Sequence, residues 1–131
     1  MKLIHYINFI FIIALLAFIC IIEEVTVSNS LENIQNRCYK IEQMVDNTDG
    51  LKTQEIVLAM DNLEYVWLEN ESTLCYMVNH KNIQEIGQEI AKAKGYIAGD
   101  DVKEFKVCIN TIVMYCHSYL HFMGASIHNV L

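Results

Sequence analysis

The sequence LIHYINFIFIIALLAFICII, residues 3–22, is the most distinctive stretch of the chain. Its 20 residues carry no charge. As an α-helix they would be about 30 Å long, which is the thickness of the hydrocarbon core of a bilayer. A buried strand or a core helix is seldom so long and so uniformly apolar. We therefore predict a transmembrane helix within residues 1–22.

Two alternatives to a permanent anchor stay open. A cleaved signal peptide has a shorter apolar run that ends in small residues, whereas Glu23 and Glu24 follow this run directly. Lipid modification of Cys20 would need a small residue before the cysteine, and Ile19 occupies that position. The sequence favours an uncleaved signal anchor over both alternatives.

The charges beside the apolar run predict its orientation. Lys2 and the terminal amine precede it, and Glu23 and Glu24 follow it. Positive charge tends to remain on the cytoplasmic side. We predict a single-pass protein of the cytoplasmic membrane, anchored through residues 3–22, with the N-terminus inside and residues 23–131 outside.

The charge balance excludes one class of partner. The chain has 131 residues, of which 16 are acidic and 9 are basic. Because Lys2 precedes the anchor, the part outside the membrane would be more acidic still. Such a surface repels phosphate backbones and anionic head groups. We therefore expect no binding to nucleic acid.

Residues 23–131 have the apolar periodicity of helices. The chain contains no proline, and its apolar residues recur at steps of three and four. Turn formers interrupt this pattern at residues 46–50, 79–82 and 99–100, where Gly99 and Asp100 are expected to supply a helix stop and an N-cap. The expected helices are residues 23/31–46, 51–78, 82–98 and 101–130.

The core positions of these helices follow from the same spacing. They are Leu31, Ile34, Cys38, Ile41 and Val45 in the first helix, Ile56, Met60, Leu63, Trp67, Asn70, Leu74 and Met77 in the second, Ile83, Ile86, Ile90, Ala93 and Ile97 in the third, and Val102, Phe105, Ile109, Ile112, Cys116, Tyr119, Met123, Ser126 and Val130 in the fourth. Four such helices with short connections predict an all-α fold, an antiparallel up-down bundle after the transmembrane helix.

The junction between the anchor and the bundle can be read in two ways. VTVSNS, residues 25–30, contains poor helix formers and would favour a break. A first bundle helix that began at Leu31 would, however, be much shorter than the second and fourth. We expect the anchor to continue into the first bundle helix with at most a kink.

Asn70 falls on a core position, so its amide is expected to have hydrogen-bond partners there. Residues 70–72 also match a glycosylation acceptor, but a helix interior is an unsuitable place for one.

Three of the five histidines, His117, His121 and His128, fall on the side of the fourth helix away from its core positions. We expect them to be exposed and independent. As an alternative, His80 in the turn at 79–82 lies at the same end of the bundle as His121 and His128. These three could form a metal or proton-sensing cluster, with Glu85 nearby.

The cysteines allow one disulfide. Cys38 lies about ten residues before the first connection and Cys108 about nine after the third, so they would have equal heights on neighbouring helices. A bridge between them is allowed on an oxidising side of the membrane. The other reading is that Cys38 and Cys116 are small core residues.

No nucleophile–base pair, phosphate loop or cofactor motif is present in the sequence. We therefore expect neither enzymatic activity nor a cofactor.

The fourth helix is more apolar than one core face requires, and Val107 and Met114 point away from that face. Exposed apolar patches mark partner sites. The leading hypothesis is an interaction or scaffold module with a protein partner or a homo-oligomer through this helix. The alternative is an extracytoplasmic sensor of an ion, pH or a small ligand, which would use the histidine cluster or a cavity around Tyr76, Tyr115 and Tyr119.

Four short motifs carry a family resemblance. They are Trp67 with Asn70, the His80 turn followed by Ile83 and Ile86, the Tyr96–Asp101 segment, and the ending with Ser126, Asn129 and Leu131. Through them the chain resembles a bacterial family of domains of unknown function, number 4363, whose members are small helical proteins with a single anchor. Similar proteins often carry an aspartate where this chain has Asn79. The resemblance implies a fold and a location, and it implies no activity.

Overall fold

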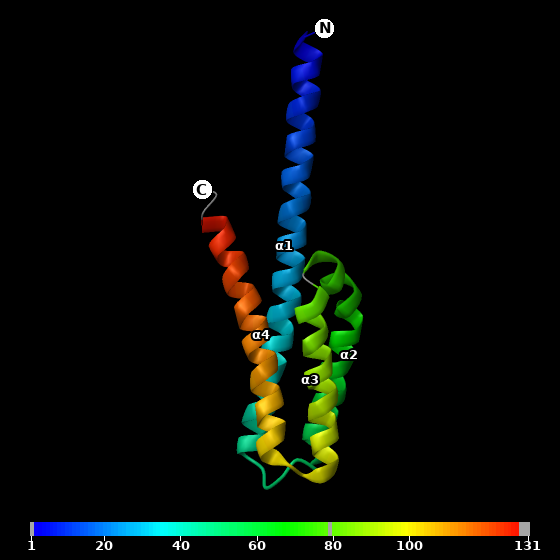
Figure 1. Ribbon diagram of the computed structural model, residues 1–131, viewed down its shortest axis with the longest axis vertical. Helices are drawn as coiled ribbons and strands as arrows, with labels where there is room; N and C mark the ends of the chain where they lie inside the picture. The colour runs from blue at the N-terminus through cyan, green and yellow to red at the C-terminus, as the bar shows by residue number, and fades with distance from the viewer. Residues whose placement is uncertain (1, 79, 129–131) are drawn as a thin grey trace.

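The computed structural model describes residues 2–78 and 80–128, with side chains for residues 4–78 and 83–122. The described residues form four α-helices: α1 (Lys2–Asp46), α2 (Gln54–Met77), α3 (His80–Gly99) and α4 (Val102–His128). Each helix packs against two others, in the closed order α1, α2, α3, α4 (Figure 1). The expected up-down bundle is therefore confirmed.

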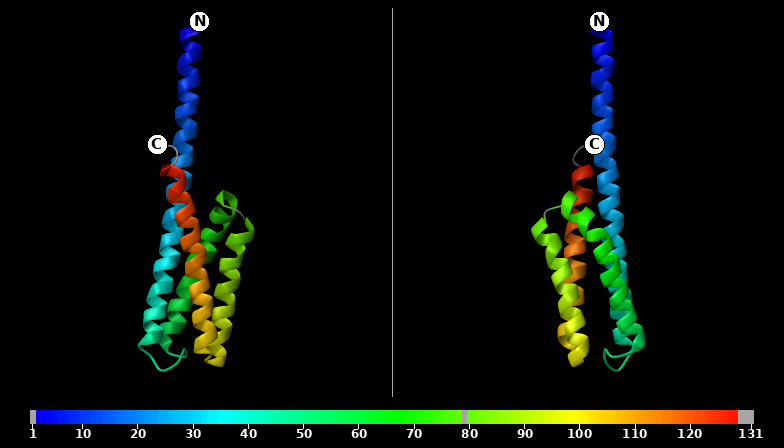
Figure 2. Two further views of the ribbon diagram at one scale, coloured as in Figure 1. Left: turned by 60° about the vertical axis from the view of Figure 1, so that its left-hand side comes forward. Right: turned by 90° about the vertical axis from the view of Figure 1, so that its right-hand side faces the viewer.

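The first helix is unbroken over 45 residues. Its N-terminal part projects beyond the bundle with exposed side chains from Ile4 to Ile22, and its C-terminal part packs within the bundle (Figures 1 and 2). Among the described residues, α1 alone is long and apolar enough to cross a membrane. The expected continuity between the apolar run and the bundle is confirmed, because Val27 is buried and Ser30 has a partner on α2.

Most of the core consists of apolar positions that the spacing predicts, and Val27, Leu51, Val66 and Cys108 are buried in addition. Phe105 and most of the predicted isoleucines and leucines are almost fully buried. Each such side chain contributes about 1.5–3 kcal/mol relative to exposure. Partial burial occurs near helix ends, at Met77, Ile97, Val102 and Tyr119. The side chains of Met123, Ser126 and Val130 lie outside the described residues.

Asn70 lies at the edge of the core and is half-buried. Its Nδ2 donates to the Val66 carbonyl at 2.8 Å, and its Oδ1 accepts from the Ser30 hydroxyl at 2.9 Å. Asn70 therefore has the partners that a core amide needs, and its bond to Ser30 fixes the register of α2 against α1.

A hydrogen bond joins the α1–α2 connection to the α3–α4 connection. Both connections lie at the end of the bundle that is farther from the apolar run. The Leu51 amide donates to Asp100 Oδ1 at 2.6 Å, and the Leu51 side chain is fully buried. Gly50 has a φ of +110°, and a Cβ at this position would lie 3.0 Å from the same carboxylate. Only glycine adopts this conformation without strain, so it allows the close approach. We refer to the Leu51–Asp100 contact as the distal clasp.

The expected N-cap at Asp100 is wrong. Asp100 has a φ of 56° and terminates α3, while the Asp101 amide donates back to the Tyr96 carbonyl at 3.1 Å. This is the pattern of a helix end with a left-handed residue, a position that glycine usually occupies. Asp101 caps α4 instead, and its Oδ1 accepts from the Glu104 amide at 3.1 Å.

Two glycines of α3 have opposite surroundings. A Cβ at Gly87 would lie 2.8 Å from Trp67 Nε1, and Trp67 is itself buried. A Cβ at Gly95 would meet nothing within 4 Å. Gly87 therefore permits the close approach of α2 and α3, whereas Gly95 only weakens the helix.

We predict that alanine at these two positions shifts stability in opposite directions. Gly87→Ala should lower the free energy of unfolding by about 1–3 kcal/mol, because Trp67 must move. Gly95→Ala should raise it by about 0.5–1 kcal/mol through helix propensity. Urea unfolding of the full chain in a mild detergent, followed by circular dichroism, measures both. A stabilising Gly87→Ala would show that the indole does not pack as described.

Candidate functional site

One side of α4 presents apolar side chains to solvent. Val107, Met114 and Phe122 are 52%, 57% and 74% exposed. At 100° per residue they lie within a half-turn of one another, together with His117 and His121. We call these five residues the α4 outer face. The structure thus places Val107 and Met114 where the sequence predicts them.

Other apolar residues of α4 serve the bundle itself. Val113 and Leu120 are partly buried and pack against the core. Among the α4 side chains that the structure describes, the apolar surface that the core does not use therefore lies on the outer face.

The two described histidines of α4 are neighbours. The rings of His117 and His121 stack with centroids 6.3 Å apart and planes inclined by 5°. Both are exposed. They lie on the side away from the core that the sequence indicates, but they contact each other and are not independent.

The predicted metal cluster lies mostly outside the described side chains. Of His80, His121 and His128, only His121 has a described side chain. Glu85, the expected neighbour, accepts a hydrogen bond from the Tyr115 hydroxyl. Within the part of the chain that has described side chains, no group of three or more metal-ligating residues comes together. The cluster stays a prediction.

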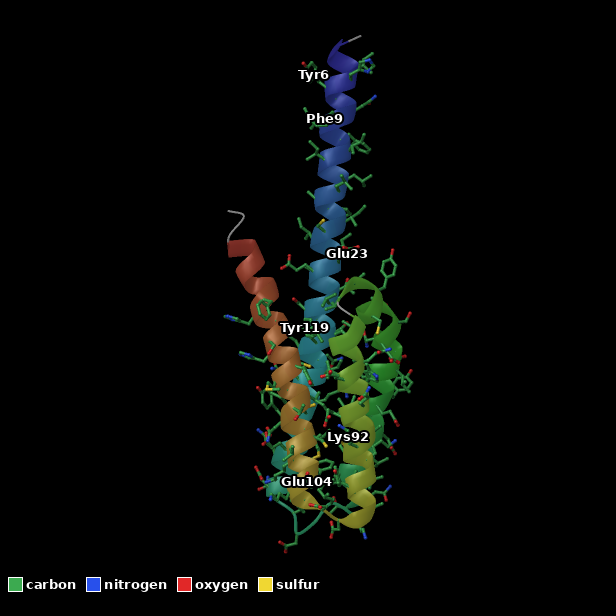
Figure 3. All side chains as sticks on the ribbon, viewed as in Figure 1. Tyr6, Phe9, Glu23, Lys92, Glu104 and Tyr119 are labelled. Atoms are coloured by element: carbon green, nitrogen blue, oxygen red, sulfur yellow. The ribbon has the colours of Figure 1, made fainter. Side chains whose placement is uncertain are left out.

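A cavity of about 350 Å³ lies where α1 leaves the bundle. Figure 3 labels Glu23 of α1 and Tyr119 of α4 near this point, and in Figure 1 α4 diverges from α1 towards its C-terminal end. The lining of the cavity combines two carboxylates with apolar and aromatic side chains: Cys20, Glu23, Glu24, Val27, Met77, Val78, Tyr119 and Phe122.

Of the three tyrosines around which the sequence suggests a cavity, Tyr119 lines this one, whereas Tyr76 and Tyr115 do not, and the α1 residues of the lining were not predicted. These α1 residues recur at steps of three and four, as a single helix face does, and Tyr119 and Phe122 are three apart on α4. That spacing shows which residues share a face. It does not show that α4 diverges from α1.

The structure does not contain the bridge that the sequence allows between Cys38 and Cys108. All five cysteines, each in the described part of the chain, are free thiols. An ion pair between Lys106 and Asp46 sets the register of α4 against α1. Position 38 therefore lies opposite about position 114, six residues or about 9 Å from position 108. A disulfide requires Cα atoms within about 7 Å.

The register gives the cysteines other neighbours. Cys38 lies near Cys116 within the core, whereas Cys108 lies near Glu89 of α3. The predicted pairing requires that both connections end at the same level along the bundle axis. The Asp46–Lys106 pair shows that they do not.

Burial makes the three core thiols weak acids. It raises the pKa of Cys116 to about 12, and it raises that of Cys38 even further, with the nearby Cys116 and Glu42 adding to the effect. Burial, followed by a hydrogen bond with Glu89, raises the pKa of Cys108 to about 11. The thiolate is the nucleophile, so these thiols are unreactive near neutral pH.

The chain matches the model of a known protein family. The family described as a domain of unknown function (DUF4363) matches residues 21–130. The match begins at the end of the apolar run and covers the whole bundle. No curated protein and no solved structure matches the chain.

We predict that the core thiols make the bundle sensitive to alkaline pH. In the unfolded chain they ionise near pH 9.0, whereas in the fold they stay protonated. The unfolded state then binds fewer protons, so stability is full below about pH 9 and falls as pH rises towards the native pKa. Each thiol contributes at most about 1.4 kcal/mol per pH unit.

Urea unfolding of the full chain in detergent at several pH values between 8 and 11 measures this slope. The variant Cys38→Ala/Cys116→Ala should have a shallower slope than the parent, whatever its absolute stability. Cys20→Ala, which lies in the apolar run, is the matched control and should leave the slope unchanged. Equal slopes for the parent and the double variant would contradict the prediction.

Proposed function

We propose a function on the premise that the chain belongs to the DUF4363 family, whose model matches residues 21–130. The match confirms the resemblance seen in the sequence, and the description of the family, a domain of unknown function, leaves the role to be argued from geometry. In this proposal residues 3–22 anchor the chain in the cytoplasmic membrane with the N-terminus inside. The bundle outside is a non-enzymatic interaction module that binds a protein partner through the α4 outer face.

The apolar part of α1 supports the anchor. Its side chains from Ile4 to Ile22 are exposed in the isolated chain. Leaving so many large apolar side chains in water is unfavourable by about 1.5–3 kcal/mol each, and a bilayer removes them from water. Lys2 before the run and Glu23 and Glu24 after it support the proposed orientation.

The single observation that carries the interaction role is the exposure of Val107, Met114 and Phe122 along one helix. The bundle does not need these side chains, because each helix already buries its own apolar seam. A row of exposed apolar residues on an otherwise acidic chain is typical of a surface that a partner covers.

The cavity at the junction of α1 and α4 favours a second candidate, a small-ligand sensor. Its volume of about 350 Å³ suits a small organic molecule. Glu23 and Glu24 on its wall would favour a cation with an apolar part. A sensor of this kind would bind its ligand in the cavity and would not use the histidine cluster.

We predict that a photo-crosslinking residue placed at Met114 captures a protein in native membranes. The same residue at Ala91, an exposed position on the neighbouring helix α3, is the matched control and should capture little. The readout is the number and mass of the adducts after irradiation. Equal adducts at both positions, or none at either, would remove the support for a partner surface on α4.

Cysteine labelling of the same chain tests on which side of the membrane the bundle lies. In a background of Cys20→Ala and Cys75→Ala the remaining thiols are buried. A membrane-impermeant maleimide added to intact cells should then label Tyr76→Cys and should spare Lys2→Cys. The reverse pattern would show that the bundle lies inside.

The sensor candidate has its own test. A hydrophobic amine should raise the unfolding temperature of the full chain in detergent, because it binds only the folded state. Glu23→Gln/Glu24→Gln should abolish the shift, whereas Glu32→Gln, an exposed change further along α1, should preserve it. A shift that survives the double change would place the amine elsewhere.

A further inference from the structure

We propose that the α4 outer face packs against α2 of a second copy of this chain, so that neighbouring copies form rows in the membrane. This inference rests on the proposed function and names its partner. It follows from the surface of α2, from the positions of α2 and α4 in the bundle, and from the charges on both helices.

The outer side of α2 is also apolar. Leu58, Tyr65, Leu68 and Tyr76 are each more than half exposed. At 100° per residue, Leu58, Tyr65 and Tyr76 lie within about 20° of one line along the helix, and Leu68 lies beside it. We call these four residues the α2 outer face.

The two outer faces point to opposite sides of the bundle. α2 and α4 each pack against α1 and α3, and the described parts of α2 and α4 do not approach each other closely along the backbone, so they occupy diagonal corners. One copy therefore carries both halves of the proposed interface and cannot join them within itself. Contacts between like faces close as dimers, whereas contacts between unlike faces continue from copy to copy, as a ring where the rotation closes and as an open row where it does not.

Copies in one membrane would present these helices in the same direction. α2 and α4 both run towards the end of the bundle from which the apolar part of α1 projects (Figure 1). Copies anchored by α1 have a common orientation, so α4 of one copy lies parallel to α2 of the next.

The contacts of α1 relate the heights of α2 and α4. Arg37 of α1 hydrogen bonds to Asn62 of α2, and Cys38 lies near Cys116 of α4. Measured through α1, position 62 of α2 is thus level with about position 116 of α4.

The contacts of α3 give a second measure. Lys94 of α3 pairs with Asp61 and Glu64 of α2, and Lys92 lies near Cys108 of α4. Through α3, position 62 is level with about position 106. The two measures differ by about ten residues, or about 15 Å along the helix. They bracket offsets from about 44 to about 54 residues between the helices, and the central offset is about 49 residues.

That offset aligns the two apolar faces. Leu58 and Val107 are 49 positions apart, and so are Tyr65 and Met114. On both helices the next residue of the row follows after seven positions, which is two turns. Parallel helices of neighbouring copies would therefore bring Leu58 to Val107 and Tyr65 to Met114.

Charge favours this pairing over pairing of like faces. α2 carries five acidic residues and no basic one, whereas α4 carries Lys103, Lys106 and its histidines with Glu104 as its one acid. Two α2 faces together would bring like charges into contact, which is destabilising. Two α4 faces would likewise bring lysines together. Unlike faces avoid both juxtapositions.

Individual charges also fall at the same offset. Glu55 and Lys103 are 48 positions apart, and so are Glu69 and His117. The two acids are rotated from Leu58 in one sense, and the two bases are rotated from Val107 in the other. When parallel helices face each other, these residues lie on the same flank of the interface.

The test uses thiol pairs between copies in native membranes. One copy carries Tyr65→Cys and the other carries Met114→Cys, each with its own tag, in the Cys20→Ala/Cys75→Ala background of the full chain. A short bismaleimide should join the unlike copies at least about tenfold more than it joins two Met114→Cys copies, a ratio that corresponds to about 1.4 kcal/mol. Ala91→Cys paired with Met114→Cys is the matched control and should remain at background.

A second variant tests the charged flank. Glu69→Arg in the Tyr65→Cys copy should lower the yield with Met114→Cys about tenfold, because it replaces the acid on this flank with a base that faces the lysines and histidines of α4. Glu71→Arg, which lies off the α2 outer face, changes the same charge and should leave the yield near its parent value. Circular dichroism of each variant verifies the fold.

Other outcomes separate this inference from the proposed function. Preferential joining of two Met114→Cys copies would show a dimer through α4 and would overturn the row. Photo-adducts from Met114 to a different protein, without joined copies, would overturn the inference and preserve the interaction role. Neither joined copies nor adducts would overturn both.

Discussion

The unbroken hydrogen-bonded backbone of α1 is the constraint on which the remaining geometry depends. The same helix is apolar on all sides in residues 3–22 and apolar on one side from Val27 to Val45. Because no bend separates the two parts, the direction of the apolar part fixes the direction of the bundle. The cavity beside Glu23 and both outer faces therefore have defined heights along a single axis.

Polar contacts at the edges of the core then set how the helices lie against one another. The described core side chains are apolar, and apolar surfaces alone allow helices to slide by a turn. The Ser30–Asn70 bond and the Asp46–Lys106 pair each hold one register against α1. An exposed ion pair contributes little to the free energy of unfolding, so the main effect of such contacts is to select one alignment of the helices.

Much of this fold was predictable from spacing, because a step of three or four residues determines which face of a helix an apolar side chain occupies. The burial of Ile34 and Phe105 and the exposure of Met114 all follow from that rule. Predictions that needed a relation between two helices were less successful. The Cys38–Cys108 bridge depended on register, and the cavity depended on the divergence of α4 from α1. Neither quantity is encoded in the periodicity of one helix.

The distal clasp also makes the bundle unequal from end to end. At one end Asp100 holds the Leu51 amide, and the Leu51 side chain closes the core. At the other end a hollow separates α1 from α4. Local opening starts where fewest contacts must break. The fewer contacts at that end mean that local opening of the bundle should begin beside the apolar run and should reach the distal clasp last.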